Sequence, residues 1–228
     1  MVITLWLSHL NNINMKKLFI IALGLTTFSL ALQTEVKAQA ASGDQIRFGI
    51  KAGANLTKVG EFNFLDTYYD SKHKVGFQAG VYADIPLGSS FAFLPEATFT
   101  QKGGKVEETV LGTTGKIETT INYLDIPFMI GYRATPELTI FAGPQVSFLL
   151  SQKTALYEDG EQQGDDITDT DNFRKSLAGA AAGLGYRIGD NLNINARYMM
   201  DFQEAAKDNV EQDRMKNSGF ALSLGYSF

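Results

Sequence analysis

The sequence predicts an all-β fold, an eight-stranded antiparallel transmembrane β-barrel with short periplasmic turns and long extracellular loops. Eight segments, each of about ten residues or more, alternate apolar side chains with small or polar ones, which is the period of a strand with one apolar face. The connections between them alternate strictly between a few residues and roughly a dozen or more, an asymmetry that is typical of transmembrane barrels. The 22 glycines favour the same fold, because they suit turns and tightly packed strands.

Composition and charge exclude several classes of protein. Hydrophobic residues make up 44% and charged residues 20%, which indicates a globular chain rather than a disordered one. The net charge of -5 becomes -7 when the first forty residues, with three lysines and one glutamate, are removed. This balance argues against nucleic acid as a partner. The chain has no cysteine, which excludes disulfides, thiolate metal sites, a cysteine nucleophile and lipid attachment at an N-terminal cysteine.

The N-terminal part has the pattern of a secretory signal peptide. Met15 and two lysines open a basic stretch, an apolar run follows at 18–32, and small residues come next. The run is shorter than the roughly 20 residues of a spanning helix. We expect translation to start at Met15 and cleavage to follow Ala40, with Ala38 as the second choice and an uncleaved membrane anchor as the alternative. The predicted division is 1–40, a signal peptide with an upstream extension, and 41–228, the barrel domain.

The first four predicted strands lie at 45–56, 75–85, 91–102 and 122–133. In the first of them, Phe48 and Ile50 belong to the apolar row, whereas Lys51 belongs to the opposite row with glycines and polar residues. A tight turn after Pro86 separates the second strand from the third. Proline lacks a backbone donor, so Pro95 predicts a bulge or a locally broken ladder in the third strand, as do Pro127 and Pro144 further on.

The last four predicted strands lie at 137–151, 173–188, 192–203 and 216–228. A tight turn at 189–191 joins the strands at 173–188 and 192–203. The long connections of the whole chain are the predicted extracellular loops, and they lie at 57–74, 103–121, 152–172 and 204–215. The closing strand has an unbroken row of large apolar residues, which are Phe220, Leu222, Leu224, Tyr226 and Phe228. It resembles the C-terminal strand of bacterial outer-membrane barrels, and the resemblance implies recognition by the outer-membrane insertion machinery through this row and its terminal aromatic residue.

Several phrases also resemble one family. They include RFGIKAGANLTKV at 47–59, INYLDIPFMIGYR at 121–133 and LSLGYSF at 222–228. They are similar to the PorT-type outer-membrane β-barrel family of Bacteroidetes, in which a Y-L-x-I-P phrase matches Tyr123 to Pro127 here. The resemblance implies the fold and the outer membrane as location, and through the family's namesake an accessory role in secretion.

Four charged residues are candidates for a structural cluster in the lumen. Lys51, Glu96, Asp125 and Arg197 lie near the middle of their predicted strands, on the row opposite the large apolar residues. Eight strands leave a lumen just wide enough for side chains, so we expect these charges to pair and to close the pore. The alternative is a path for protons or ions through the same charges.

The loop at 152–172 is strongly acidic and is a candidate cation site. Asp165, Asp166, Asp169 and Asp171 supply the carboxylate oxygens that Ca²⁺ prefers, although their spacing is not that of an EF-hand. A solvated acidic loop is the alternative and the stronger interpretation. Divalent ions that bridge the loop to lipopolysaccharide phosphates are a further alternative. We expect no cofactor and no dedicated metal site.

Three functions are compatible with the sequence. The preferred one is a non-enzymatic surface or structural barrel of the cell envelope, whose long loops bind a partner or the lipopolysaccharide layer. The second is an accessory component of an outer-membrane secretion or transport system that contacts other envelope proteins. The third is a lipid-modifying enzyme centred on His73, which is the single histidine after residue 40 and has no placed nucleophile beside it.

Overall fold

The computed structural model describes residues 45–64, 67–110, 112–168, 170–207 and 215–228. All regular elements within these ranges are strands, and none of the described residues forms a helix long and apolar enough to cross a membrane. The predicted signal peptide, its upstream extension and the cleavage after Ala40 lie outside the described residues.

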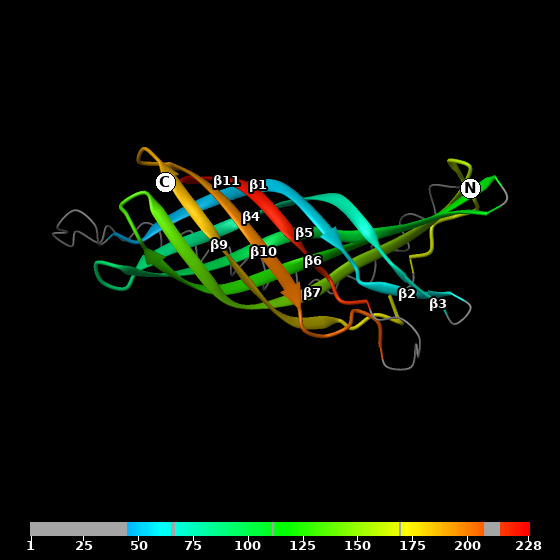
Figure 1. The fold of residues 1–228 in the computed structure, drawn as a ribbon. Coiled ribbons are helices and arrows are strands. Elements are labelled where there is room, and N and C mark those ends of the chain that lie inside the picture. The colour runs from blue at the N-terminus through cyan, green and yellow to red at the C-terminus, as the bar shows by residue number, and fades with distance from the viewer. Residues whose placement is uncertain (1–44, 65–66, 111, 169, 208–214) are drawn as a thin grey trace, which may run out of the picture. The chain divides into compact units, whose positions relative to one another are not determined.

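Eight strands of the described chain close into a ring in which each pairs with its two neighbours in sequence (Figure 1). These strands are β1 (Arg47–Lys58), β4 (Lys72–Pro86), β5 (Phe91–Val110), β6 (Thr113–Arg133), β7 (Leu138–Glu158), β9 (Ser176–Ile188), β10 (Leu192–Asp201) and β11 (Ser218–Ser227). All pairs are antiparallel, and β1 closes the ring by pairing with β11, where Ala52 lies opposite Leu224. The predicted fold class, an eight-stranded antiparallel barrel, is confirmed.

Three short strands decorate one end of the ring. The first long connection contains the hairpin of β2 (Glu61–Phe64) and β3 (Thr67–Asp70), and β8 (Glu161–Gln162) pairs with the end of β7. The opposite end has the short turns after β4, β6 and β9, together with the start of β1 and the end of β11. In transmembrane barrels the short turns face the periplasm, so the end with β2, β3 and β8 is the outer end.

The alternation of side chains separates a lipid-facing surface from a filled lumen, as the sequence predicts. Ile50 is 52% exposed, whereas the next residue, Lys51, is 4% exposed. In β11, Phe220 and Leu222 are 59% and 58% exposed, and Ala221 between them is 5% exposed. A soluble barrel would bury its apolar row, so this inverted distribution is that of a barrel whose outer surface contacts lipid.

The predicted loop at 103–121 is wrong, because β5 and β6 continue through it as one long hairpin. Lys105 pairs with Glu118, Val106 with Ile117, and the ladder ends where Val110 lies opposite Thr113. The segment is rich in threonine, valine and isoleucine, which favour strands, and this signal outweighs its polar appearance. Similarly, β7 extends to Glu158, into the predicted loop at 152–172.

The prolines interrupt the ladders locally without turning the inner rows outward. Pro95 pairs with Phe128 and Pro144 with Ala180, while the register shifts lie elsewhere, between His73 and Gln78 and between Asn122 and Tyr123. The inner faces of β5 and β6 are therefore kept across their prolines.

Close contact between β1 and β11 depends on Gly53. A methyl group at this position would overlap the carbonyl oxygen of Leu222 and lie 2.6 Å from Ser223 Cα. We expect Gly53→Ala to destabilise the closed barrel by about 1–3 kcal/mol, the scale of overpacking in a tight interior. The loss of heat-modifiable migration on gels measures this. Gly115→Ala is the matched control, because its nearest neighbour is Glu108 O at 4.0 Å, and equal loss in both variants would contradict the explanation.

Candidate functional site in the barrel interior

A three-residue charge cluster lies in the lumen and joins strands that are not neighbours in the sheet. Lys51 Nζ, from β1, donates hydrogen bonds to both carboxylate oxygens of Glu96 in β5, at 2.8 and 2.7 Å. Arg197 Nη1, from β10, donates to Glu96 Oε2 at 2.7 Å. The side chains of Lys51 and Arg197 are each 1% exposed, so one carboxylate holds two buried cations together.

Gln78, from β4, extends this cluster. Its Oε1 accepts a hydrogen bond from Arg197 Nη2, so the guanidinium is fixed by a carboxylate on one side and an amide on the other. Bonds of this kind, with one charged partner, are shorter and stronger than neutral ones. Three of the four residues predicted to form the cluster are therefore brought together.

Asp125 is the exception, because it contacts Lys102 instead of Lys51 or Arg197. Lys102 Nζ lies 3.4 Å from Asp125 Oδ1 and 3.3 Å from Asp201 Oδ2, and the ammonium also faces the ring of Tyr123 at 4.8 Å from its centroid. The strands of a barrel are staggered against one another, so two residues in the middle of their own strands need not reach the same height. Asp125 thus belongs to a second group, in which one lysine lies between two buried aspartates.

Lys102 is the functional residue that the sequence reasoning missed. Lys102 lies an even number of residues from Glu96 on β5, so both side chains belong to the inner face. In the predicted strand at 91–102, however, Lys102 was the last residue. Because β5 continues to Val110, Lys102 lies well inside the ladder and its side chain is buried. The alternation of the longer segment was the signal that could have identified it.

Apolar side chains fill much of the remaining interior. Met129, Phe141, Ala181, Met199 and Ala221 form one cluster with Leu94, from six strands of the ring. Charged and apolar packing together leave the central lumen filled, as expected for a barrel of eight strands.

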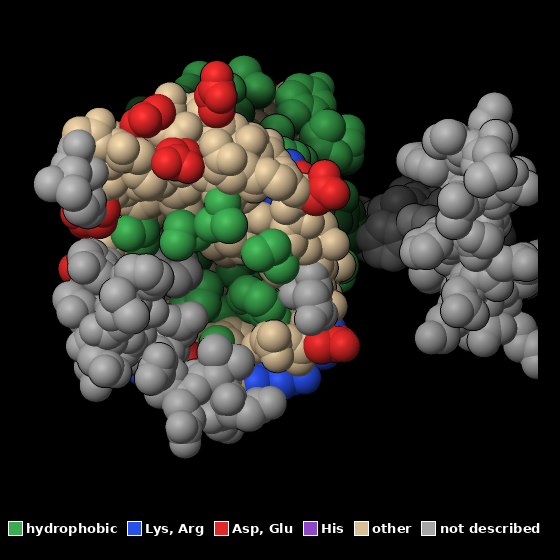
Figure 2. Space-filling model, turned by 90° about the vertical axis from the view of Figure 1, so that its right-hand side faces the viewer, with side chains coloured by type: hydrophobic (Ala, Val, Ile, Leu, Met, Phe, Trp, Pro, Cys, Tyr) green, Lys and Arg blue, Asp and Glu red, His purple; other side chains and the backbone are tan. Residues whose placement is uncertain are grey.

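A second apolar cluster closes the outer end of the lumen. It combines Tyr123 and Leu177 on strands with Ala205, Ala206 and Met215 from the connection between β10 and β11. Backbone hydrogen bonds hold this connection in place, from Ala205 N to Met215 O at 2.7 Å and from Arg174 N to Ala205 O at 2.8 Å. Figure 2 shows hydrophobic side chains gathered in the middle of this end, with acidic side chains around the margin.

The acidic residues of the predicted cation site do not converge. Asp166 is paired with Lys153, with 2.6 Å between Oδ2 and Nζ, and Asp165 points into solvent. Lys207 Nζ donates to the carbonyl oxygen of Asp171 at 2.6 Å, and Asp169 lies outside the described residues. In the part of the chain that the structure describes, no three acidic or histidine side chains are placed to hold a metal ion. The solvated acidic loop therefore stays the preferred interpretation of this segment.

His73 and the closing apolar row lie on the outside. His73 is exposed at the outer end of β4, where it pairs with Gly104. Phe220, Leu222, Leu224, Tyr226 and Phe228 all point away from the lumen and are exposed by 46–75%. The row is therefore placed to contact lipid, and its recognition by the insertion machinery stays a prediction.

Removing Arg197 tests whether the central cluster stabilises the barrel. We expect Arg197→Ala to lower the free energy of unfolding by about 3 kcal/mol, because it leaves Gln78 Oε1 buried without its donor and takes from Glu96 one of its two buried cationic partners. Urea titration of the protein in lipid vesicles, followed by tryptic digestion, measures the change. Lys153→Ala breaks the exposed pair with Asp166 and serves as the control, for which we expect almost no change. If both substitutions lowered the free energy of unfolding equally, the buried cluster would contribute no more than an exposed ion pair, which would contradict this prediction.

The filled lumen also predicts negligible conductance. Planar-bilayer recordings of the unmodified protein should show no steady single-channel current at neutral pH, because side chains occupy the space an ion would need. Large, regular current steps would reopen the interpretation of the interior charges as an ion path.

Comparisons with known proteins agree with this architecture. The chain matches the family model "Outer membrane protein beta-barrel domain" over residues 37–204. No curated protein is significantly similar to it. Among solved structures, the chain is similar to Ail, the attachment invasion locus protein of Yersinia pestis, at 18% identity and a TM-score of 0.47, covering 80% of this chain and 98% of that chain.

Two further structures are similar at the same low level. OprG from Pseudomonas aeruginosa is 14% identical with a TM-score of 0.42, covering 82% of this chain and 97% of that chain. Neisserial surface protein A is 12% identical with a TM-score of 0.40, covering 79% of this chain and 97% of that chain. Likeness at this level does not extend to ligands or partners. The family match spans most of the chain, and with the lipid-facing apolar surface it leads to one conclusion: the chain belongs to the outer membrane protein beta-barrel domain family and resides in the outer membrane.

Proposed function

We propose that the protein is a non-enzymatic surface protein that binds an extended, basic polypeptide outside the cell. The observation that carries this proposal is a three-stranded sheet, formed by β5, β6 and β7, that projects beyond the outer rim of the ring. We call residues 105–118 and 152–158 the outer sheet. Past Lys105, β5 has no described ladder partner other than β6, so its second edge is open.

The root of the outer sheet is held by charges. Glu118 lies 3.0 Å from Lys74 Nζ in β4 and 3.1 Å from Lys116 Nζ. Burial disfavours the charged carboxylate, but the hydrogen bonds from these lysines outweigh it and hold the pKa of Glu118 below its usual range. Lys116 Nζ also lies 4.1 Å from the centroid of the Tyr157 ring. The sheet is therefore anchored to the barrel in its charged state at neutral pH.

One face of the outer sheet has features of a binding surface. Val106, Ile117 and Leu156 pair across the three strands and form an apolar row, in which Ile117 is 37% and Leu156 is 40% exposed. The outer sheet and the segment 159–166 that follows it together contain eight acidic and three basic side chains. An extended polypeptide with alternating apolar and basic residues fits these features. Its backbone can pair with the open strand edge, its apolar side chains can contact the apolar row, and its basic side chains can pair with the acidic residues.

This charge also favours a polypeptide over lipopolysaccharide, whose phosphates would be repelled by the acidic surface. The other functions from the sequence have less support. The resemblance to the PorT-type family rests on sequence phrases such as the one around Tyr123. It is the basis of the alternative function, an accessory role in secretion. The non-enzymatic assignment is supported by the exposed position of His73 at the outer end of β4, whereas Asp125 and Asp201 are buried in the lumen.

Shortening the outer sheet tests the proposal. Because Lys105 and Glu118 are ladder partners, replacing residues 106–117 by Asn-Gly closes a two-residue hairpin at the rim. Extended peptides selected from a displayed library on the purified barrel in detergent should contain basic residues, and we expect their affinity to fall at least tenfold in the shortened variant. Fluorescence anisotropy of the selected peptides measures this.

The chain offers a matched control in the β2–β3 hairpin. Glu61 and Asp70 are also ladder partners, so replacing residues 62–69 by Asn-Gly removes a segment of similar kind from the same end. Peptide affinity should be retained in this variant, and both variants should keep heat-modifiable migration. Failure to select any peptide, or equal loss in the two shortened proteins, would disprove the assigned surface.

A further inference from the structure

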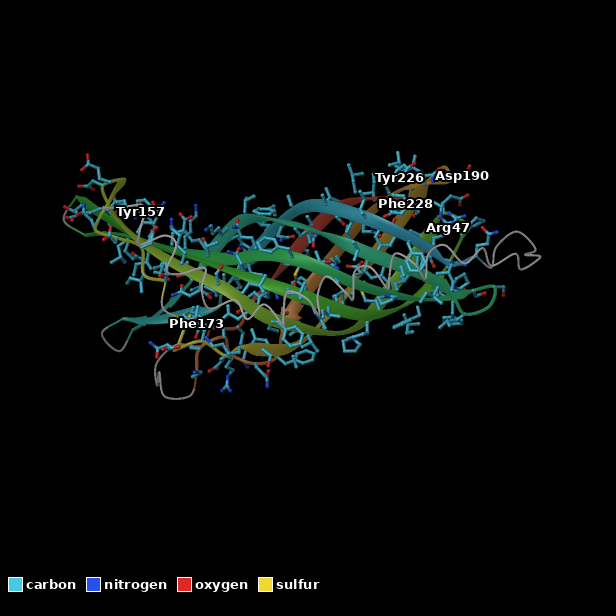
Figure 3. The ribbon with its side chains drawn as sticks, turned by 180° about the vertical axis from the view of Figure 1, so that it is seen from behind. Arg47, Tyr157, Phe173, Asp190, Tyr226 and Phe228 are labelled. Carbon is cyan, nitrogen blue, oxygen red and sulfur yellow. The ribbon has the colours of Figure 1, made fainter. Side chains whose placement is uncertain are left out.

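Three arginines from three different strands converge in a pocket at the periplasmic end of the lumen. Arg47 in β1, Arg133 in β6 and Arg187 in β9 line a cavity of about 80 Å³ that also reaches Glu96. Figure 3 shows Arg47 and Asp190 at the same end as Phe228, opposite the end that carries Tyr157 and Phe173. The pocket is therefore separate from the outer sheet.

The arginines share too few carboxylates. Asp84 is the common partner of two of them, with Oδ1 at 2.7 Å from Arg133 Nη2 and Oδ2 at 3.7 Å from Arg187 Nη2. Arg47 donates instead to the backbone carbonyl of Asp190 at 2.9 Å, and no described carboxylate lies within ion-pair distance of its guanidinium. Among the described residues, the guanidinium of Arg47 thus contacts only a neutral acceptor.

The surrounding lumen does not correct this imbalance. Among the described residues that line the pocket, Glu96 is the one carboxylate deeper in the lumen, and it is already shared by Lys51 and Arg197. Asp84, Glu96 and Glu137 are the described carboxylates of the lining, and they are shared by five cations: Arg47, Arg133 and Arg187 in the lining, and Lys51 and Arg197, which contact Glu96 without lining the pocket. These cations exceed the lining carboxylates by two, and in a partly enclosed pocket their field on an anion is stronger than in bulk water.

Neutral donors and acceptors complete one wall. Asn193 Nδ2 donates to the hydroxyl oxygen of Tyr82 at 2.7 Å, and that hydroxyl is hydrogen-bonded to Ser227 Oγ at 2.8 Å. Asn195 Nδ2 donates to Asn193 Oδ1 at 2.6 Å. This chain of hydrogen bonds fixes the wall opposite the charges, so the guanidinium groups face a preformed cavity.

We infer that this pocket binds one oxyanion group, a carboxylate or a phosphate, presented by a molecule on the periplasmic side. A water molecule requires roughly 10–15 Å³ of such space, so the cavity holds several waters or a single group of this size. Guanidinium is the side chain best matched to planar and tetrahedral oxyanions, because its parallel N–H groups bind two oxygens at once. The pocket accepts the anionic group alone, and the rest of the ligand extends into the periplasm.

Titration of the purified full-length barrel in neutral detergent tests this inference. The probes are inorganic phosphate and acetate, added at constant ionic strength, with heat of binding as the readout. We expect a dissociation constant below about 1 mM for at least one probe, and about tenfold or greater weakening in Arg47→Gln and Arg187→Gln, the scale of a lost charge-assisted hydrogen bond. Arg133 is left intact, since its removal would strip Asp84 of its main partner.

The two probes and a control variant separate the outcomes. Tighter binding of phosphate identifies a phosphorylated ligand class, and tighter binding of acetate a carboxylate class. Lys116→Gln removes a cation at the outer end and should bind as the unmodified protein does. Absence of heat with both probes, or equal weakening by Lys116→Gln, would overturn the inference. Neither result bears on the outer sheet, because the peptides that test it contact the opposite end of the barrel.

Discussion

The narrow diameter of an eight-stranded ring is the constraint on which the rest of this structure depends. Side chains from opposite walls meet in the lumen, so an inward charge must find a partner on a distant strand. Lys51, Glu96 and Arg197 satisfy this requirement across β1, β5 and β10. The same narrowness explains the glycines of the inner rows, such as Gly53, where a side chain would overlap the next strand.

Charge is distributed unevenly along the barrel. Lys102 lies between Asp125 and Asp201 in the outer half, so that group contains one acidic residue more than it has cations. The periplasmic half contains the opposite excess, centred on Arg47 and Arg187. Because the interior between them is filled, the two excesses cannot neutralise each other by movement of ions through the lumen. The group around Lys102 is buried beneath the apolar cluster of the outer end, whereas Arg47 and Arg187 line the periplasmic pocket.

The two ends consequently differ in what they can contact. The outer end is closed by the apolar cluster around Tyr123 and Met215, and it projects a sheet with an exposed apolar row beside the acidic segment 159–166. The periplasmic end is an open, basic pocket that fits only a small group. A barrel with a filled lumen and two dissimilar mouths is suited to binding at its surfaces, and the membrane-spanning strands act as the rigid support for both.

Much of the architecture was predictable from the sequence, because the period of a strand assigns each residue to a face without knowledge of its neighbours. The alternation of Ile50 and Lys51, or of Leu222 and Ser223, was enough to predict lipid-facing and lumen-facing rows, and the spacing of turns predicted eight strands. The extension of β5 and β6 through 103–121 was not predicted, because the many polar residues of this segment are typical of a loop and hide the strand preference of its β-branched residues.

Which charges meet was decided only by the tertiary structure. Asp125 and Arg197 both lie on the inner face, near the middle of their strands. Because the strands are staggered, Asp125 nevertheless pairs with Lys102, and Arg197 pairs with Glu96. The convergence of Arg47, Arg133 and Arg187 likewise depends on ring closure, since these residues are far apart in the sequence. Alternation is a local property of the chain, whereas contacts across the lumen depend on the tilt and stagger of the complete ring, which no single segment encodes.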